Sequence, residues 1–317
     1  MPILPIARCD ARRSAFEGLD AATLSAGELG ATFVPELGMI GVSLTHAGEE
    51  LLDRRHGLRA YRDNGAVMGL PLLHPWANRL SGDAYELHGR RVRLEDVTRD
   101  DQGLPIHGLL HAHPGWEIEF LTADDDGACL RASLDFAADR SLLAGFPFSH
   151  ELTIAARLTP QALTVTTTLN ATGGAPVPVA FGFHPHLRLP GSDRRRWALR
   201  LPRRRHLELD PRGIPTGHGR GEPPARFELA ELAFDDGYDG LADGAFFAVS
   251  DGRRTLTVTH HVGFPVAQVY SPRGAQFICF EPMTAPVDAL RSAVGLRRAL
   301  PGAPPFTAEF SVAVEAA

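Results

Sequence analysis

Short runs in which apolar and polar residues alternate recur along most of the chain. Two examples are Leu-Thr-Val-Thr at residues 163–166 and Thr-Leu-Thr-Val-Thr at residues 255–259. A period of two residues is typical of a strand with one buried and one solvated face. Gly, Pro, Asp and Asn, which favour turns, separate the runs. Strands are predicted over residues 38–45, 116–121, 129–136, 151–158, 162–169, 246–249, 255–260, 266–270, 277–281 and 306–314.

Helical patterns are few, and this decides the predicted fold class. Residues 286–298 contain the material for one short helix. Strands do not alternate with amphipathic helices of about 10–15 residues, so a doubly wound parallel sheet is disfavoured. No linker or sequence repeat divides the chain. We therefore predict an all-β protein, a large antiparallel β-sandwich with few short helices, as a single domain over residues 1–317.

The least regular segment spans residues 191–224. It contains two arginine triplets, within residues 194–205, and then a stretch rich in Gly and Pro over residues 213–224. The pattern indicates strand-edge arginines followed by a long surface loop. The arginines are also suited to binding a phosphate group.

Charge and composition exclude several classes of function. The formal net charge is −6, which argues against nucleic acid as a partner. All 32 basic residues are arginine. Without lysine the chain cannot form a Schiff base on a lysine side chain, so lysine-dependent aldolases and pyridoxal-phosphate enzymes are excluded. A Walker-type phosphate loop would also lack its lysine.

Cysteine usage and hydropathy indicate the cellular compartment in which the protein is expected. Cys9, Cys129 and Cys279 are far apart and odd in number, as expected for a reducing compartment without structural disulfides. No apolar run reaches the roughly 18 residues of a membrane span, and residues 1–10 lack a signal-peptide pattern. The expectation is a cytoplasmic protein without a membrane partner.

Two segments each place one proton-transfer group at the end of an apolar run, directly before a proline. His184 follows Phe181-Gly182-Phe183 and precedes Pro185, while Glu281 follows residues 277–280 and precedes Pro282. A histidine can donate a proton near neutral pH, and a carboxylate can accept one. Both residue types also occur as buried groups that backbone or arginine hydrogen bonds satisfy.

The histidines leave a metal site open as an alternative. His184 and His186 are two positions apart, so on an extended chain both point to one face. His107, His111 and His113 would be possible further ligands. However, the glutamate that usually follows such a pair in cupin-type barrels is not present, because residues 187–190 read Leu-Arg-Leu-Pro.

A second polar cluster, at residues 73–80, could bind hydroxyl groups. Asn78 and Arg79 offer amide and guanidinium donors, and Trp76 could pack on the apolar face of a sugar or belong to the core. Asp235 could also hold a hydroxyl, although aspartates in such a position are often turn formers.

Together these segments resemble the aldose 1-epimerase (galactose mutarotase) family. The resemblance covers nearly the whole chain and rests on five segments that occur in the order of that family. They are Pro-Trp-Ala-Asn-Arg-Leu at 75–80, Ile-His-Gly at 106–108, Gly-Phe-His-Pro-His at 182–186, Phe-Asp-Asp-Gly-Tyr at 234–238 and Phe-Glu-Pro-Met-Thr-Ala-Pro-Val-Asp-Ala-Leu at 280–290.

This resemblance implies the β-supersandwich of the family, without cofactor or metal. By position Glu281 would be the general base and His184 the general acid. His107, Arg79 and Asp235 would hold sugar hydroxyls. The expected partner is an aldohexose or a sugar phosphate, and the expected assembly is a monomer or a homodimer.

Two positions depart from the family pattern. His186 stands where tyrosine is common, and His74 precedes Pro75. Neither is one of the two residues matched to the acid and the base. Both leave the preferred sugar undecided.

Three other functions remain as alternatives. A hexose-6-phosphate 1-epimerase would use the arginines of residues 194–205. A non-catalytic carbohydrate-binding module could use the same fold. A glycosidase would need a second carboxylate about 5–10 Å from Glu281, for which the sequence offers no candidate in a comparable context.

Overall fold

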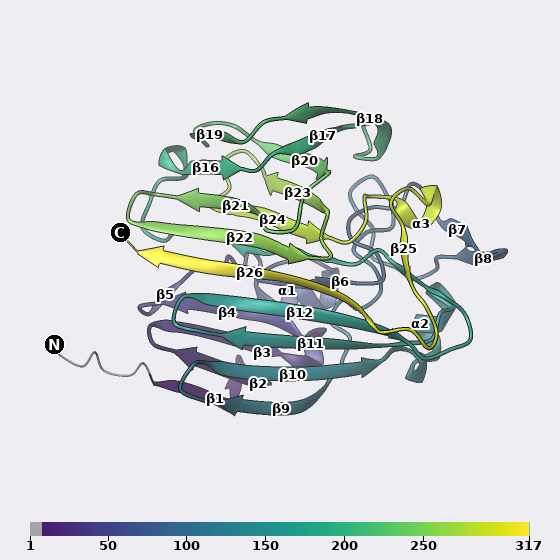
Figure 1. The fold of residues 1–317 in the computed structure, drawn as a ribbon, viewed down its shortest axis with the longest axis horizontal. Helices are drawn as coiled ribbons and strands as arrows, with labels where there is room; N and C mark the ends of the chain where they lie inside the picture. The colour runs from purple at the N-terminus through teal and green to yellow at the C-terminus, as the bar shows by residue number, and fades with distance from the viewer. Residues whose placement is uncertain (1–7, 317) are drawn as a thin grey trace.

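The structure, a computed structural model, describes residues 8–316 (Figure 1). It is mostly β, with 52% of residues in strands, and its sheets are antiparallel. The predicted all-β class is confirmed. Each predicted strand is present, with ends that differ by a few residues.

A nine-stranded sheet forms one continuous layer across the molecule (Figure 1). Its strand β12 alternates strictly between partly exposed and buried positions, as the sequence pattern predicts. In spatial order the sheet contains β19 (Ala225–Glu228), β16 (Ala198–Leu201), β21 (Ala245–Ser250), β22 (Arg254–Val262), β26 (Phe306–Ala316), β12 (Ala162–Ala171), β11 (His150–Leu158), β10 (Ala128–Asp135) and β9 (Glu117–Ala123).

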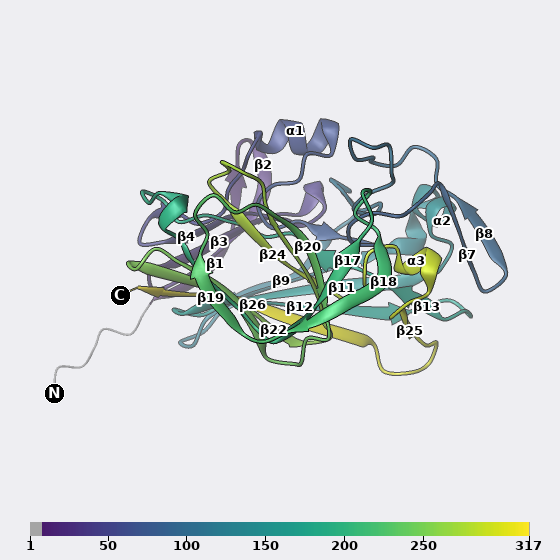
Figure 2. The same ribbon diagram turned by 90° about the horizontal axis from the view of Figure 1, so that it is seen from above.

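Two further sheets lie side by side on one face of this layer (Figure 2). The five-stranded sheet contacts β10 and β11 of the large sheet. It contains β1 (Cys9–Phe16), β2 (Leu19–Ala26), β3 (Leu29–Val34), β4 (Ile40–His46) and β5 (Glu49–Glu50).

The eight-stranded sheet packs on the other half of the layer through aromatic rings. Phe247 of the large sheet stacks on Phe280 with ring centroids 5.5 Å apart. The sheet contains β18 (Pro215–Glu222), β17 (Arg204–Leu209), β20 (Phe234–Asp239), β23 (Val266–Ser271), β24 (Ile278–Met283), β14 (Gly182–Phe183) and β6 (Leu72–Leu73), and β15 (His186–Leu187) also pairs with β24.

Strand β24 is central to the candidate site because all its residues are buried. Since successive side chains of a strand point to opposite faces, Phe280 enters the core while Glu281 points away from the large sheet. Two separate two-stranded sheets join β7 (Ala84–Leu87) to β8 (Arg90–Arg93) and β13 (Val177–Val179) to β25 (Arg297–Ala299).

Helices are short and peripheral. They are α1 (Gly57–Asn64), α2 (Arg140–Gly145), α3 (Ala289–Ser292) and the 3-10 turns η1 (Pro35–Leu37), η2 (Phe136–Ala138) and η3 (Arg194–Arg196). Within residues 8–316 no helix has the length and hydropathy needed to cross a membrane.

Of two further sequence expectations, one is confirmed and one needs correction. The short helix expected from residues 288–293 is present as α3, which ends where Ala293 adopts a left-handed φ of 59°. The long surface loop expected over residues 213–224 is largely the edge strand β18, which pairs with β17. Backbone hydrogen bonds form this strand without any apolar side-chain pattern.

Candidate active site

Strand register brings His184 and Glu281 together. Gly182 pairs with Met283, and His186 pairs with Cys279, so the intervening His184 faces Glu281. Pro185, between β14 and β15, cannot donate a backbone hydrogen bond. The two chain segments that carry the predicted acid and base therefore meet on adjacent strands.

The two side chains form a buried pair. His184 Nε2 lies 3.2 Å from Glu281 Oε1, and the residues are 5% and 1% exposed. Burial raises the pKa of the Glu281 carboxyl well above its usual range, and repulsion by Asp235 adds to this. Burial also lowers the pKa of His184 well below its usual range. Both shifts favour the uncharged forms, in which the proton is on Glu281 and the pair carries no net charge.

Rings enclose His184 on several sides. His186 stacks on it, with centroids 4.4 Å apart and planes inclined by 9°. His107 approaches edge-on at 5.5 Å. Burial lowers the pKa of both His107 and His186 to about 3, so both are neutral near pH 7. The His184 imidazole is therefore held in one orientation, with Nε2 toward Glu281.

Several buried polar atoms in this region have no hydrogen-bond partner among the described residues. A buried polar group without a partner is costly, so such a concentration indicates a place where a polar ligand completes the bonding. The atoms are His184 Nδ1, Glu281 Oε2, His107 Nδ1, His186 Nε2 and Gln268 Oε1.

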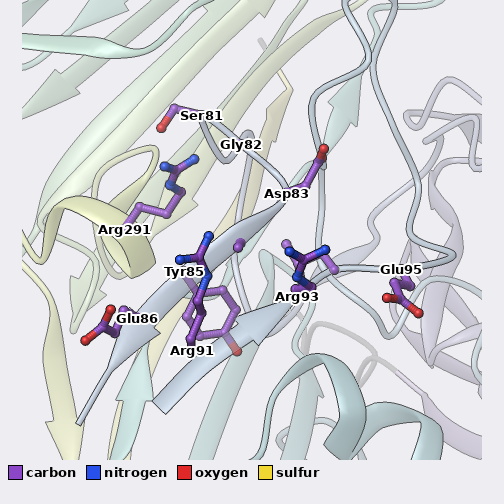
Figure 3. A pocket seen from close by; sticks show the side chains of 11 residues that line it. Ser81, Gly82, Asp83, Tyr85, Glu86, Arg91, Arg93, Glu95 and Arg291 are labelled. Carbon is purple, nitrogen blue, oxygen red and sulfur yellow. The ribbon is translucent and has the colours of Figure 1, made fainter. Parts of the chain in front are cut away.

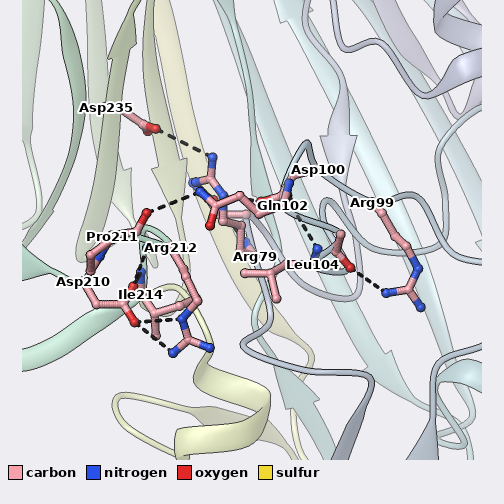
Figure 4. Close-up of polar contacts among 12 residues, drawn as sticks. Arg79, Arg99, Asp100, Gln102, Leu104, Asp210, Pro211, Arg212, Ile214 and Asp235 are labelled. Carbon is pink, nitrogen blue, oxygen red and sulfur yellow. Dashed lines mark hydrogen bonds and ion pairs between the residues drawn. The ribbon is translucent and has the colours of Figure 1, made fainter.

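Arg79 lies at the outer side of the pair and is held by three neighbours (Figure 4). Its Nε donates to Asp100 Oδ2 at 2.7 Å, and its Nη1 donates to Asn78 Oδ1 at 3.0 Å. Arg79 Nη2 lies 3.7 Å from Asp235 Oδ2. The structure thus places Arg79, Asn78 and Asp235 in one network, as their predicted shared role requires.

Gln268 belongs to this network, although the sequence analysis did not identify it. The residue is 1% exposed, pairs with Glu281 in the ladder between β23 and β24, and donates from Nε2 to Asp235 Oδ1 at 2.7 Å. An amide inside the apolar run of residues 266–270 is as expensive to bury as the carboxylate that drew attention to Glu281. That cost is the signal that could have found it.

Trp76 lies apart from this network. It is 1% exposed and packs in the main hydrophobic core, so neither face is available to a ligand in this structure. The predicted sugar contact of Trp76 is replaced by the core role that the sequence also allowed.

The histidine cluster considered for a metal is divided by the fold. His111 Nε2 contacts the Tyr61 carbonyl, and His113 Nε2 lies 3.1 Å from Asp139 Oδ2. His184, His186 and Cys279 can offer one ligand atom each within 4.8 Å of one another. However, the stacked rings of His184 and His186 run parallel, so their nitrogen lone pairs do not converge on one ion without rotation of a ring.

Five of the cavities among residues 8–316 are lined by other residues than His184 and Glu281. One of these, of about 670 Å³, lies beside the β7–β8 pair and Arg291 (Figure 3). The pair instead lies beneath the Arg79 and Asp235 side chains, which are 18% and 48% exposed. The His184 and Glu281 side chains are themselves only 6% and 1% exposed.

Comparison with known proteins shows the family to which the chain belongs. The model of the aldose 1-epimerase family matches residues 20–303. A search of curated protein sequences finds no significant match.

Solved structures of several organisms share the fold. A galactose mutarotase-like protein from Clostridium acetobutylicum aligns with a TM-score of 0.83 at 16% identity, covering 98% of this chain and 99% of that one. The galactose 1-epimerase of Lactobacillus acidophilus NCFM aligns with a TM-score of 0.76 at 13% identity, covering 98% and 99%. The aldose epimerase homologue of C. elegans aligns with a TM-score of 0.69 at 15% identity, covering 98% and 99%.

Proposed function

Because the chain belongs to the aldose 1-epimerase family, we propose that it interconverts the α and β anomers of an aldose by acid–base opening and reclosure of the sugar ring. The observation that carries this proposal is the buried contact of 3.2 Å between His184 Nε2 and Glu281 Oε1. This contact brings a group that can accept a proton next to one that can donate a proton. Buried polar atoms without a hydrogen-bond partner among the described residues lie around it.

In the forward half of the reaction the Glu281 carboxylate takes the proton of the C1 hydroxyl, and the His184 imidazolium protonates the ring oxygen. The bond between C1 and the ring oxygen breaks, which leaves an open-chain aldehyde, a protonated Glu281 and a neutral His184. The aldehyde group then rotates, so that the hydroxyl that closes the ring meets the other face of the carbonyl. The two proton transfers run in reverse as the ring closes. The charge balance requires only one proton on the pair throughout.

The directions of the two pKa shifts fit this cycle. Burial favours the proton on Glu281, which is the arrangement reached when the ring is open. To begin a turnover the proton must move across the 3.2 Å contact to His184. The C1 hydroxyl promotes this transfer, because a hydrogen bond donated to the carboxylate stabilises its charged form.

The surrounding groups suit a polyhydroxylated ligand. Arg79, Asp235 and Gln268 present donors and acceptors at the outer side of the pair, and His107 lies against His184. Asn78 orients Arg79 through its amide oxygen. These groups would hold the ring hydroxyls and steady the oxygens as charge shifts.

We propose a free aldose rather than a sugar phosphate as the substrate. Four of the arginines at residues 194–205, which suggested a phosphate, already have other partners: Arg194, Arg195, Arg204 and Arg205. Arg194 is 2% exposed and donates to backbone carbonyl oxygens, and Arg204 pairs with Glu222. A test is the rate with glucose against glucose 6-phosphate, in which a strong salt-sensitive preference for the phosphate would contradict this choice.

Polarimetry on freshly dissolved α-glucose or α-galactose tests the activity. Glu281→Gln should lower kcat about 10²- to 10⁴-fold, because the amide cannot accept the proton. Glu309→Gln, at a partly buried glutamate of β26 that bonds Thr166, is a matched control and should keep full activity. A fully active Glu281→Gln protein would remove Glu281 from the mechanism. Sugar binding without any change of anomer would support a binding module instead.

A further inference from the structure

Two turns far apart in the sequence share one five-residue pattern. Residues 100–104 read Asp-Asp-Gln-Gly-Leu, and residues 210–214 read Asp-Pro-Arg-Gly-Ile. In each turn Oδ1 of the first residue accepts hydrogen bonds from the backbone N–H groups of the third and fifth residues, at 2.8–3.0 Å. The fourth residue, Gly103 or Gly213, has a φ of 79° or 76°. Each turn is thus fixed by its own aspartate and glycine.

The two turns meet around Arg79 (Figure 4). Asp100 accepts a hydrogen bond from Arg79 Nε at 2.7 Å. A Cβ atom at Gly213 would lie 3.0 Å from Arg79 Nη1, so the second turn rests against the guanidinium. Gln102 Nε2 donates to the carbonyl oxygen of Pro211 at 3.3 Å and joins one turn to the other.

The last residues of both turns pack in one cluster with a residue of strand β24. Leu104 and Ile214 pack in one small apolar cluster that includes Ala77 and Met283. Met283 lies two residues after Glu281 on β24 and points to the same face. We call residues 100–104 and 210–214 together the rim. It closes over the side of the site at which Arg79 lies.

We propose that the rim is the specificity-determining element of this site, and that it admits an aldose with a single ring and excludes a reducing disaccharide. The inference rests on the proposed function, because that function places C1 at His184 and Glu281. The opposite side of a pyranose, which carries the O4 hydroxyl, then points outward to Arg79. A second ring linked through O4 would have to leave through the rim.

The contact across the rim is too close for such a ring. Gln102 and Pro211 are at hydrogen-bond distance, 3.3 Å. A sugar ring held between two surfaces needs roughly 7 Å, twice the separation of about 3.5–4.0 Å between non-bonded atoms. An O4-linked ring therefore requires the contact between Gln102 and Pro211 to break.

The test compares the mutarotation rates of α-galactose and α-lactose by polarimetry, in the native chain and in Gln102→Ala. Asp101→Asn is the matched control, since Asp101 is exposed in the same turn and does not reach the other one. The native chain should prefer the monosaccharide at least about tenfold. Gln102→Ala should reduce this preference by about 2- to 12-fold, the value of one hydrogen bond between neutral groups, and Asp101→Asn should leave it unchanged.

Equal native rates for the two sugars would overturn the inference while leaving the proposed function intact. The inference would also be overturned if Gln102→Ala and Asp101→Asn changed the preference for the monosaccharide by the same factor. If neither sugar changes anomer, the proposed function fails. Calorimetric titration of both sugars then tests the role of the rim separately from catalysis. The proposed role predicts that galactose binds more tightly than lactose, and equal affinities would overturn it.

Discussion

Two buried pairs of polar side chains in this protein look alike and differ in what surrounds them. His74 and His150 meet with their Nε2 atoms 2.8 Å apart, and His184 meets Glu281 at 3.2 Å. The first pair is packed among phenylalanine rings, and Phe136 stacks on His150 at 4.4 Å. The second is surrounded by polar groups.

The unused hydrogen-bonding capacity separates the two pairs more clearly than burial does. At the first pair His150 uses both ring nitrogens, and only His74 Nδ1 has no partner in the described part of the chain. Around the second pair, unpartnered atoms occur on five residues. The comparison teaches that a candidate site is marked by polar atoms that still need a partner, whereas a buried pair among aromatic rings is part of the core.

The largest expected difference is in catalysis, and the same substitution can be made in both pairs. His184→Asn should lower kcat about 10²- to 10⁴-fold, because asparagine cannot supply the proton to the ring oxygen. His150→Asn should keep the kcat of the folded protein. Polarimetry at saturating sugar measures both, and an equal loss of kcat in the two variants would erase the proposed contrast.

The second expectation concerns acid stability. Burial lowers the pKa of His150 and His260 to about 4 and that of His107 and His186 to about 3. The unfolded chain binds these protons near pH 6.5, so between about pH 6.5 and 4 the native protein holds fewer protons than the unfolded one. Its unfolding free energy should fall on acidification by up to about 1.4 kcal/mol per pH unit for each histidine.

Glu281 acts in the opposite sense. Its raised pKa means that the native state holds the extra proton, so its contribution is present at low pH and is lost as the pH rises through the folded-state pKa. Urea unfolding over a pH series from about 7 to 4.5 measures the sum. A flat stability over that range would show that the histidines are not buried as described.

A smaller effect is expected for stability at neutral pH. His150→Asn should lower the unfolding free energy by about 1–3 kcal/mol, because it leaves His74 Nε2 without its partner in a dry, aromatic environment. His184→Asn should cost less, since neighbouring polar groups can pair with the amide. Urea denaturation at pH 7 compares them, and the reverse order would refute this account of the two environments.

The smallest effect should appear in substrate affinity at the rim. Gly213→Ala adds a methyl group 3.0 Å from Arg79 Nη1 and should raise KM several-fold by moving the guanidinium. Gly217→Ala is the matched control, because Gly217 also has a positive φ of 89° but nothing within 4 Å of the added carbon. Both variants share a backbone strain of about 1 kcal/mol, so only a difference in KM between them reports on Arg79.

The strands that carry the site could be predicted from sequence because burial leaves a clear signature. The apolar runs that end at His184 and Glu281 are too expensive to expose, and their polar ends are too expensive to bury without a purpose. Both members of the pair could be predicted on these grounds. The register that sets them face to face depends on two strands about 100 residues apart and was not visible locally.

Other parts left no such trace in the sequence. The edge strand β18 is made of glycine and polar residues, and only its pairing with β17 defines it. Trp76 could serve a core or a ligand equally well until its burial was known. The rim was hidden because each of its turns is ordinary alone, and its meaning arises from the contact between Gln102 and Pro211.

The register Gly182–Met283 and His186–Cys279 has a consequence for how this protein can change. A slip by a single residue would turn one of the two reactive side chains to the other face of the sheet, so the chemistry is inherited with the sheet as a whole or lost with it. The two turns of the rim do not depend on this register. If the proposed function and the proposed role of the rim hold, substitutions in these turns change sugar preference and leave the His184–Glu281 pair in place.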